Sequence, residues 1–270
     1  MRIILISRID DKDALHYTHR LSHLLEGWGH ETCFDTATAA ALGLPGCSIP
    51  DSGASLAVVV GGDGSILLAI QRMTRQIPVL GINWGEVGFL ADIEPAEAEE
   101  FLRQITHGFP TEQRMRITIT RNGEMLGDAL NEALIITSRP AKMLRFNILV
   151  DGILVERFRA DGLLISTPTG STAYAMSAGG PIVDPRIEGV VLVPLAPYLL
   201  SSRPHVISTG RTLEIRMDSA KPAKVVIDGQ NTYEFNTEGT FLVTRATEPA
   251  LFVDARKNFF EKVNNKLRRL

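Results

Sequence analysis

The sequence predicts a fold with two parts, a Rossmann-like α/β domain at the N-terminus and an antiparallel β-sandwich domain after it. Three observations predict this division. Unbroken apolar runs alternate with helical patterns up to residue 110, as in a parallel sheet covered by helices. Period-two alternation and Asn-Gly or Asp-Gly turn signals then replace them. A helical pattern returns at the end, so we expect residues 1–110 and 246–270 to form one α/β domain around an all-β domain at 111–245.

Composition and charge exclude several classes of protein. The chain has 270 residues, of which 44% are hydrophobic, enough to bury a core in each of two domains. A net charge of −3 gives no general electrostatic case for binding nucleic acid. The two cysteines, Cys33 and Cys47, do not make a disulfide framework. The apolar run at 1–7 is too short for a signal peptide and no run could span a bilayer, so we expect a soluble, cytoplasmic protein without a membrane partner.

The first part of the chain reads as alternating strands and helices. The predicted strands are 3–6, 32–34, 56–60 and 77–82, and the predicted helices are 13–25 and 95–105. The stretch 37–52 is rich in Ala, Gly and Pro, and we expect it to form a loop. In a parallel sheet the loops after the strands gather at one edge, where α/β proteins bind their ligands.

The most informative of these loops is Gly61-Gly62-Asp63-Gly64, directly after the strand at 56–60. A helical pattern follows at once, with Ser65 as its expected N-cap. Glycines let backbone N–H groups approach phosphate oxygens, and a helix N-terminus adds partial positive charge. A carboxylate repels phosphate, so Asp63 suits the role of a base or of a partner for a phosphate-bound metal. The alternative is an ordinary tight turn, and this stretch alone does not decide.

The second part carries the hairpin signals. Residues 115–120 alternate and lead into Asn122-Gly123, and the strand at 146–150 leads into Asp151-Gly152. Further strands are expected at 163–166, 190–193, 213–217, 224–227 and 240–244.

The final helical pattern has an apolar face, and we expect it to pack on the first domain. Its apolar residues are Phe259, Phe260, Val263 and Leu267, and its basic residues are Lys262, Lys266, Arg268 and Arg269. We expect the basic residues to form a solvated face whose charges suit a helix C-terminus.

A second motif, at 161–181, joins a strand to a short helix near Thr172 through a turn dense in hydroxyl groups. Hydroxyls and free N–H groups suit phosphate or ribose, and Tyr174 offers a ring on which a base can stack. The alternative is a Ser/Thr-rich loop with a core tyrosine, but the density of small polar residues favours a binding loop. The sequence has no Walker A loop, no G-x-G-x-x-G fingerprint and no G-x-S-x-G elbow.

Five motifs occur in this order along the chain: Gly61-Gly62-Asp63-Gly64, Asn131-Glu132, Asp161-Gly162, the run 167–174 and Asp228-Gly229-Gln230. Taken together, they resemble the bacterial type of NAD kinase over nearly the whole chain. The glycine turn alone is shared with diacylglycerol, sphingosine and phosphofructokinases, whereas the 161–181 motif with Asn131-Glu132 is specific. The resemblance implies transfer of a phosphoryl group from ATP or polyphosphate to the adenosine ribose 2′-hydroxyl of NAD, giving NADP. It also implies donor binding and catalysis by 1–110 with 246–270, and NAD binding by 111–245.

The resemblance assigns roles residue by residue. Asp63 would be the general base, and the phosphates would lie along Gly61, Gly62 and Gly64. The NAD-binding residues would be Asp63, Gly64, Phe89, Asn131, Glu132, Lys142, Arg159, Asp161, Thr172, Ala173, Tyr174, Ala175, Met176, Ser177 and Gln230. Among them Asn131 and Glu132 would hold ribose hydroxyls, and Phe89 with Leu90 would wall the adenine pocket. Asp161 would accept from the nicotinamide amide, in its own site or in that of a neighbouring subunit.

Two positions depart from the family pattern: Ser65 replaces the usual threonine, and Lys142 stands where many bacterial members have histidine. The resemblance further implies a divalent metal ion, Mg²⁺ above all, that accompanies the donor, and a homodimer or homotetramer. Two other interpretations stay open at this point. One is a lipid kinase of the diacylglycerol class, and the other is a non-catalytic NAD-binding regulatory module.

Overall fold

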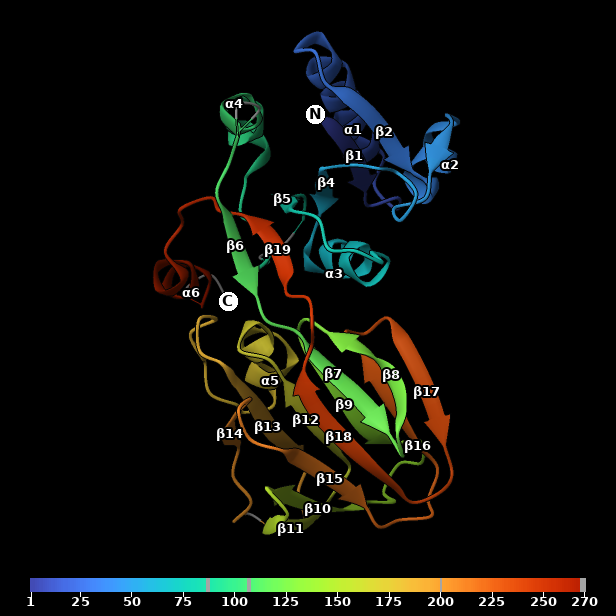
Figure 1. Ribbon diagram of the computed structural model, residues 1–270, viewed down its shortest axis with the longest axis vertical. Helices are drawn as coiled ribbons and strands as arrows, with labels where there is room; N and C mark the ends of the chain where they lie inside the picture. The colour runs from blue at the N-terminus through green and yellow to red at the C-terminus, as the bar shows by residue number, and fades with distance from the viewer. Residues whose placement is uncertain (86–87, 106–107, 200, 268–270) are drawn as a thin grey trace. The chain divides into compact units, whose positions relative to one another are not determined.

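The structure is a computed structural model that describes residues 1–85, 88–105, 108–199 and 201–267 (Figure 1). The chain forms two compact units, Met1–Gln113 with Ala250–Leu270, and Arg114–Pro249. The first unit is α/β and the second is built from antiparallel sheets, so the predicted fold class is confirmed. No helix among the described residues is long and apolar enough to cross a membrane.

The first unit is organised around a seven-stranded sheet with the order β3-β2-β1-β4-β5-β19-β6. Its strands are β1 (Arg2–Ser7), β2 (Glu31–Asp35), β3 (Gly46–Cys47), β4 (Leu56–Gly61), β5 (Val79–Asn83), β6 (Thr111–Arg114) and β19 (Ala250–Val253). Its helices are α1 (Lys12–Gly27), α2 (Thr36–Leu42), α3 (Asp63–Gln71), α4 (Pro95–Ile105) and α6 (Phe259–Leu267). Strand β19, red in Figure 1, pairs in parallel with β5, so both ends of the chain build this unit.

Strand β4 lies at the centre of this sheet, and every one of its residues is buried. A strand covered on both faces needs such an unbroken apolar sequence. Strands β1, β4 and β5 pair in parallel, which places their carboxyl ends at one edge. The glycine-rich turn after β4 therefore opens at the edge where the sequence predicted a ligand site.

Two predictions in this unit were wrong. The stretch expected as a loop contains α2 and β3, because Asp35 caps an alanine-rich segment by accepting the N–H groups of Ala37 and Thr38. Helix α3 begins at Asp63 with Gly62 as its N-cap, so Ser65 lies inside the helix. A Cβ atom on Gly61 would come within 2.4 Å of the Ser65 Oγ, so the turn needs glycine there for close packing.

The second unit contains two six-stranded antiparallel sheets, ordered β11-β10-β15-β18-β7-β8 and β14-β13-β12-β9-β16-β17. The first sheet consists of β7 (Ile117–Arg121), β8 (Glu124–Ala129), β10 (Leu144–Val150), β11 (Ile153–Ala160), β15 (Leu213–Met217) and β18 (Gly239–Arg245). The second consists of β9 (Glu132–Thr137), β12 (Gly162–Ser166), β13 (Gly189–Leu195), β14 (His205–Ser208), β16 (Ala223–Ile227) and β17 (Asn231–Phe235). Side chains of both sheets share one apolar core, as in a sandwich.

Both predicted hairpins are confirmed. The φ angles are 50° and 86° at Asn122 and Gly123, and 51° and 78° at Asp151 and Gly152. Positive φ at both central residues matches the right-handed twist of the paired strands, which explains why Asn-Gly and Asp-Gly mark these turns.

Helix α6 belongs to the first unit, as predicted from its apolar face. The expectation of a solvated basic face was wrong for Lys262, whose side chain is only 11% exposed and pairs with Asp92. Arg268 and Arg269 lie outside the described residues, so this expectation stays a prediction for them.

The shared core of the second unit yields a stability prediction. Ile215 is fully buried in that core, whereas Ile153 on the same sheet is 68% exposed. We expect Ile215→Ala to lower the free energy of unfolding by about 2–5 kcal/mol, and Ile153→Ala to change it by less than about 0.5 kcal/mol. Urea denaturation measures both, and equal losses would contradict the sandwich core.

Candidate functional site

The glycine-rich turn in the first unit has the backbone of an anion site. The first N–H groups of α3 have no partners within the helix, and they add to the partial positive charge of its N-terminus. Added Cβ atoms on Gly62 and Gly64 would meet no atom within 4 Å, so these glycines lie against open space. A phosphate group can therefore approach the backbone closely at this turn.

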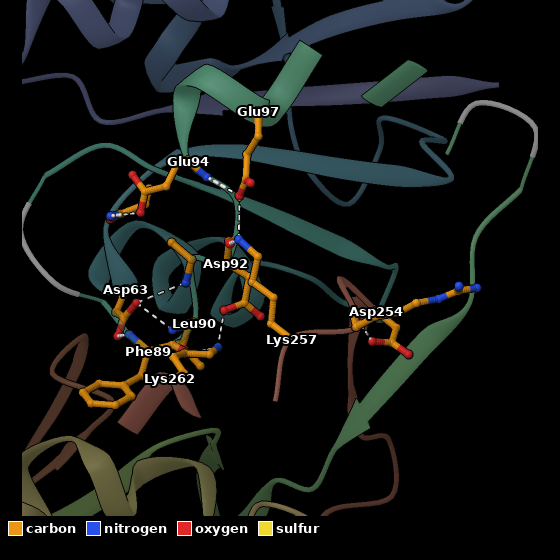
Figure 2. A network of polar contacts seen from close by, with 12 residues as sticks. Asp63, Phe89, Leu90, Asp92, Glu94, Glu97, Asp254, Lys257 and Lys262 are labelled. Atoms are coloured by element: carbon orange, nitrogen blue, oxygen red, sulfur yellow. Dashed lines mark hydrogen bonds and ion pairs between the residues drawn. The ribbon is translucent and has the colours of Figure 1, made fainter. Parts of the chain in front are cut away.

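The carboxylate of Asp63 is held by three consecutive backbone N–H groups. Oδ2 accepts from the N–H of Phe89 at 2.6 Å, and Oδ1 accepts from Leu90 at 2.8 Å and Ala91 at 3.3 Å (Figure 2). A Cβ atom on Gly88 would come within 2.4 Å of Oδ1, so only glycine lets the chain pass this close to the carboxylate. The N–H dipoles offset the negative charge that would otherwise repel phosphate at the turn.

The two oxygens of Asp63 differ in what they can still accept. A carboxylate has about four lone-pair positions, two on each oxygen. Among the bonds within the described residues, Oδ1 accepts two and Oδ2 accepts one. Oδ2 is therefore the oxygen with room for a further hydrogen, and Asp63 is only half-buried.

The C-terminal helix α6 contacts the same loop from its other side. The Lys262 Nζ donates to the Phe89 carbonyl at 2.9 Å and to the Asp92 carboxylate (Figure 2). Lys257, just before α6, donates to the Asp92 carbonyl and to Glu97. The loop 88–92 therefore lies between the start of α3 and the C-terminal segment.

Lys266 adds a further positive charge to this region. Its Nζ lies 4.9 Å from the centre of the Phe89 ring. Burial lowers the pKa of Lys266, as does repulsion from Lys262, while the charge of Asp63 acts in the opposite direction. Ala91, Asp92 and Glu94 of this region, together with residues of the C-terminal segment that include Lys262 and Lys266, line a cavity of about 620 Å³. The sequence pattern identified Lys262 and Lys266 as basic residues but gave no signal that they face this loop.

A second aspartate, Asp228, organises the candidate site in the second unit. Its oxygens accept the N–H groups of Leu130 at 2.8 Å, Asn131 at 2.8 Å and Glu132 at 3.0 Å. Asp228 is 3% exposed and has a φ of 48° in the turn after β16. Asp228 stood out in the sequence as part of a motif but was not among the predicted site residues.

These bonds hold two polar side chains ready for a ligand. Among the described residues, the buried atoms Asn131 Oδ1 and Glu132 Oε2 have no hydrogen-bond partner. Burial raises the pKa of the Glu132 carboxyl to about 7, and the negative charge of Asp228 adds to the effect. A buried acceptor without a partner is costly, and a ligand that brings hydroxyl donors would satisfy both atoms.

The hydroxyl-rich turn is mostly bonded to itself. Thr167 donates to the Leu130 carbonyl, and the Ser171 hydroxyl donates to the Pro168 carbonyl and accepts from the Val183 N–H. A Cβ atom on Gly170 would lie 2.1 Å from the Asn131 carbonyl oxygen. These hydroxyls therefore hold the turn against residues 130–131 and within itself. The sequence had led us to expect that they bind phosphate or ribose.

The residues after this turn differ in what they expose. Tyr174 in α5 (Tyr174–Ser177) is 43% exposed, and Ser177 is exposed. Thr172 is buried and donates to the Thr169 carbonyl, and the Ala175 methyl lies in an apolar core. Ala173 and Met176 are partly buried. Tyr174 and Ser177 can contact a ligand through their side chains, whereas Ala175 can do so only through its backbone.

Not all predicted NAD-binding residues lie together. Gln230 is exposed in the turn after Asp228, at the Glu132 end of β9. Strand β9 pairs with β12 so that Glu132 faces Ser166, and Thr137 donates its N–H to the Asp161 carbonyl. Asp161 therefore lies at the opposite end of β9, roughly 15 Å from Glu132 along the strand.

Two more predicted residues lie at the Asp161 end. Lys142 is exposed in the connection after β9, and Arg159 in β11 is exposed with its guanidinium 4.3 Å from the centre of the Tyr198 ring. The buried Asp161 Oδ1 has no partner among the described residues. The second unit thus presents two separate polar clusters, one at each end of β9.

The raised pKa of Glu132 predicts how stability depends on pH. The unfolded chain ionises Glu132 near its ordinary value of 4.5, and the folded chain near 7. The native state holds a proton that the unfolded state loses between these values. The contribution of this bound proton to the free energy of unfolding is therefore complete below pH 4.5 and falls as the pH rises to about 7. It amounts to up to about 3 kcal/mol.

We expect Glu132→Gln to flatten this pH dependence, because the amide does not titrate. The measurement is the free energy of unfolding of the ligand-free protein at pH 5 and pH 8, for both forms. The wild type should lose more stability between the two pH values than the variant. Equal losses would show that the protein does not hold Glu132 in its protonated form.

Comparisons with known proteins agree with this geometry. Residues 3–109 match the family model of the ATP-NAD kinase N-terminal domain, and residues 130–255 match that of the ATP-NAD kinase C-terminal domain. A protein of Methanoculleus marisnigri named NAD kinase is 63% identical over 270 residues, which is 100% of each chain. A protein of the same name from Methanoregula boonei is 60% identical, again over 100% of each chain.

Two solved structures are also similar. The NAD kinase from Archaeoglobus fulgidus in complex with ATP has a TM-score of 0.85 and 31% identity, covering 100% of both chains. Yeast NADH kinase complexed with NADH has a TM-score of 0.90, covering 99% of this chain and 87% of the other. Its identity is 21%, so it supports the fold alone. With both family domains matched and close relatives over the full length, the chain belongs to the NAD kinase family.

Proposed function

We propose that the protein phosphorylates the adenosine ribose 2′-hydroxyl of NAD with ATP as the donor, giving NADP. The observation that carries this proposal is the half-buried Asp63 carboxylate, held by three N–H groups beside open, phosphate-accepting glycines. A lipid kinase or a non-catalytic NAD-binding module would not account for the full-length relatives named NAD kinase.

The reaction needs a base because a ribose hydroxyl holds its proton tightly at neutral pH. In this proposal the 2′-oxygen attacks the terminal phosphorus of ATP while Asp63 Oδ2 takes the hydroxyl proton. The bond between that phosphorus and the bridging oxygen breaks, and ADP leaves with the electron pair. The N–H groups at Gly62 and Gly64 would stabilise the charge on the phosphates without moving.

The second unit supplies groups suited to NAD. Asn131 Oδ1 and Glu132 Oε2 would accept hydrogen bonds from ribose hydroxyls, which relieves two buried acceptors at once. Tyr174 would contact the adenosine half, and the exposed side chains of Ser177 and Gln230 would add polar contacts to NAD. We assign donor binding and catalysis to the first unit and NAD binding to the second.

The cluster at the other end of β9, formed by Asp161, Lys142 and Arg159, would bind the nicotinamide half of a dinucleotide. It lies at the other end of β9 from Glu132, so one NAD molecule must extend along the strand or the cluster must serve a second copy of the chain. The second possibility accords with the homodimer or homotetramer expected from the sequence. We also propose that the protein is located in the cytoplasm, as the sequence led us to expect.

A divalent ion would neutralise charge on the donor's phosphates during transfer. Among the described residues, no group of three or more His, Cys, Asp or Glu side chains could hold an ion by itself. Mg²⁺ often keeps several waters and binds through substrate phosphates with one or two carboxylates. An ion that arrives on the donor therefore fits this chain.

The direct test incubates the purified protein with NAD, Mg²⁺ and either ATP or polyphosphate, and measures NADP. We expect NADP with ATP, and the polyphosphate reaction decides whether the donor range is wider. Binding of NAD without NADP would identify a regulatory module. Phosphorylation of diacylglycerol in place of NAD would identify a lipid kinase.

Replacement of the base gives the sharpest kinetic prediction. We expect Asp63→Asn to lower kcat by about 10²- to 10⁴-fold, because an amide cannot take the proton. The amide NH₂ would also face at least one of the three N–H donors, so the loop 88–92 should loosen. NAD binding, measured by calorimetry on the same preparation, should remain. Near-normal turnover would exclude Asp63 as the base.

Tyr174 tests the assignment of the adenosine half. We expect Tyr174→Ala to raise the KM for NAD several-fold, because an aromatic contact contributes on the order of 1 kcal/mol. Tyr174→Phe keeps the ring and serves as the matched control, which separates stacking from hydrogen bonding. The side chain is exposed, so both variants should fold. An unchanged KM in a folded Tyr174→Ala variant would remove this residue from the site.

A further inference from the structure

The residue Phe89 connects the proposed base to the C-terminal helix. Its N–H donates to Asp63 Oδ2, and its carbonyl accepts from the Lys262 Nζ (Figure 2). Oδ2 is the oxygen to which we assign the hydroxyl proton. One residue of the loop therefore lies between the reacting oxygen and an ammonium group on α6.

The contact from α6 has the properties of a fixed support. The Lys262 side chain is mostly buried and forms an ion pair with Asp92, three residues beyond Phe89. Lys257 bonds the Asp92 carbonyl and reaches Glu97 on α4. A buried ion pair with further hydrogen bonds holds its partners in a narrower range of geometry than an exposed pair does.

The remainder of the loop is fixed on its other side. The Ile93 N–H donates to the Gly81 carbonyl at 3.1 Å, and the Ile93 carbonyl accepts from Asn83 at 2.7 Å. A Cβ atom on Gly81 would lie 2.9 Å from the Ala91 Cα, so β5 and the loop pack in direct contact. The position of the Phe89 peptide is thus set by β5, by Asp63 and by Lys262.

We propose that Lys262 is a positioning residue for catalysis, which holds the Phe89–Asp92 loop so that Asp63 keeps Oδ2 aimed for proton transfer. The inference rests on the proposed role of Asp63. Lys262 acts on the reaction through the loop and does not touch the reacting atoms. Loss of its ammonium would release the Phe89 carbonyl and leave the Asp92 carboxylate without this ion pair. A displacement of about 1 Å at such a site can lower a rate by about 10²-fold.

The test compares Lys262→Met, which keeps the apolar stem, with Lys262→Arg, which keeps the charge. We expect Lys262→Met to lower kcat by about ten- to a hundredfold while the KM for NAD changes by less than about twofold. Lys262→Arg should recover a large part of the loss. The matched control is Arg20→Met, which removes an exposed ion pair with Glu99 in the same unit and should leave kcat unchanged.

A double-mutant cycle separates positioning from general stability. If Lys262 acts through Asp63, Lys262→Met should cost less than about twofold in kcat when added to Asp63→Asn. An equal loss in both backgrounds, or no loss in either, would overturn the proposal. Normal turnover in Asp63→Asn alone would instead refute the proposed base. If Lys262→Met does not fold, Asp92→Asn breaks the same ion pair, and the cycle is measured with that variant.

Discussion

The geometry of the candidate site in the first unit depends on three backbone hydrogen bonds to the carboxylate of Asp63. A negative side chain next to a phosphate-binding turn is unfavourable unless dipoles offset its charge, and the N–H groups of residues 89–91 supply them. The rest of the local structure follows from this arrangement. Gly88 is needed for the close approach, β5 holds the end of the loop, and α6 supports its carbonyl side. The C-terminal segment is therefore joined to the first unit by hydrogen bonds to this loop as well as by its place in the same compact unit.

The second unit uses the same arrangement for another purpose. Asp228 also accepts three consecutive backbone N–H groups, two on one oxygen and one on the other, from residues 130–132. The difference is exposure, because Asp228 is buried whereas Asp63 is half-exposed. Asp228 can hold Asn131 and Glu132 in place, and its charge helps to raise the pKa of the Glu132 carboxyl. Asp63 is open to a ligand, and in the proposed function it takes the proton of the hydroxyl.

Sequence patterns predicted the parts of this structure that depend on local geometry. The glycine turn, both hairpins and the parallel strands carry local signals, and the structure places these elements where the signals predicted them. Contacts between distant segments carry no such signal. The basic face of α6 was therefore read as solvated, although Lys262 meets a loop about 170 residues earlier. The hydroxyls at 167–172 were read as ligand donors because their count does not reveal that the Leu130 and Pro168 carbonyls already accept from them.

In the proposed reaction, Asp63 is fixed by its loop and receives the proton of the NAD 2′-hydroxyl. A crystal structure of the protein with NAD bound tests it most directly, through the distance between Asp63 Oδ2 and the 2′-oxygen. We expect a distance within hydrogen-bond range, about 2.6–3.2 Å, with the N–H bonds of residues 89–91 to Asp63 retained. A 2′-oxygen bonded to another side chain, with Asp63 out of reach, would contradict it.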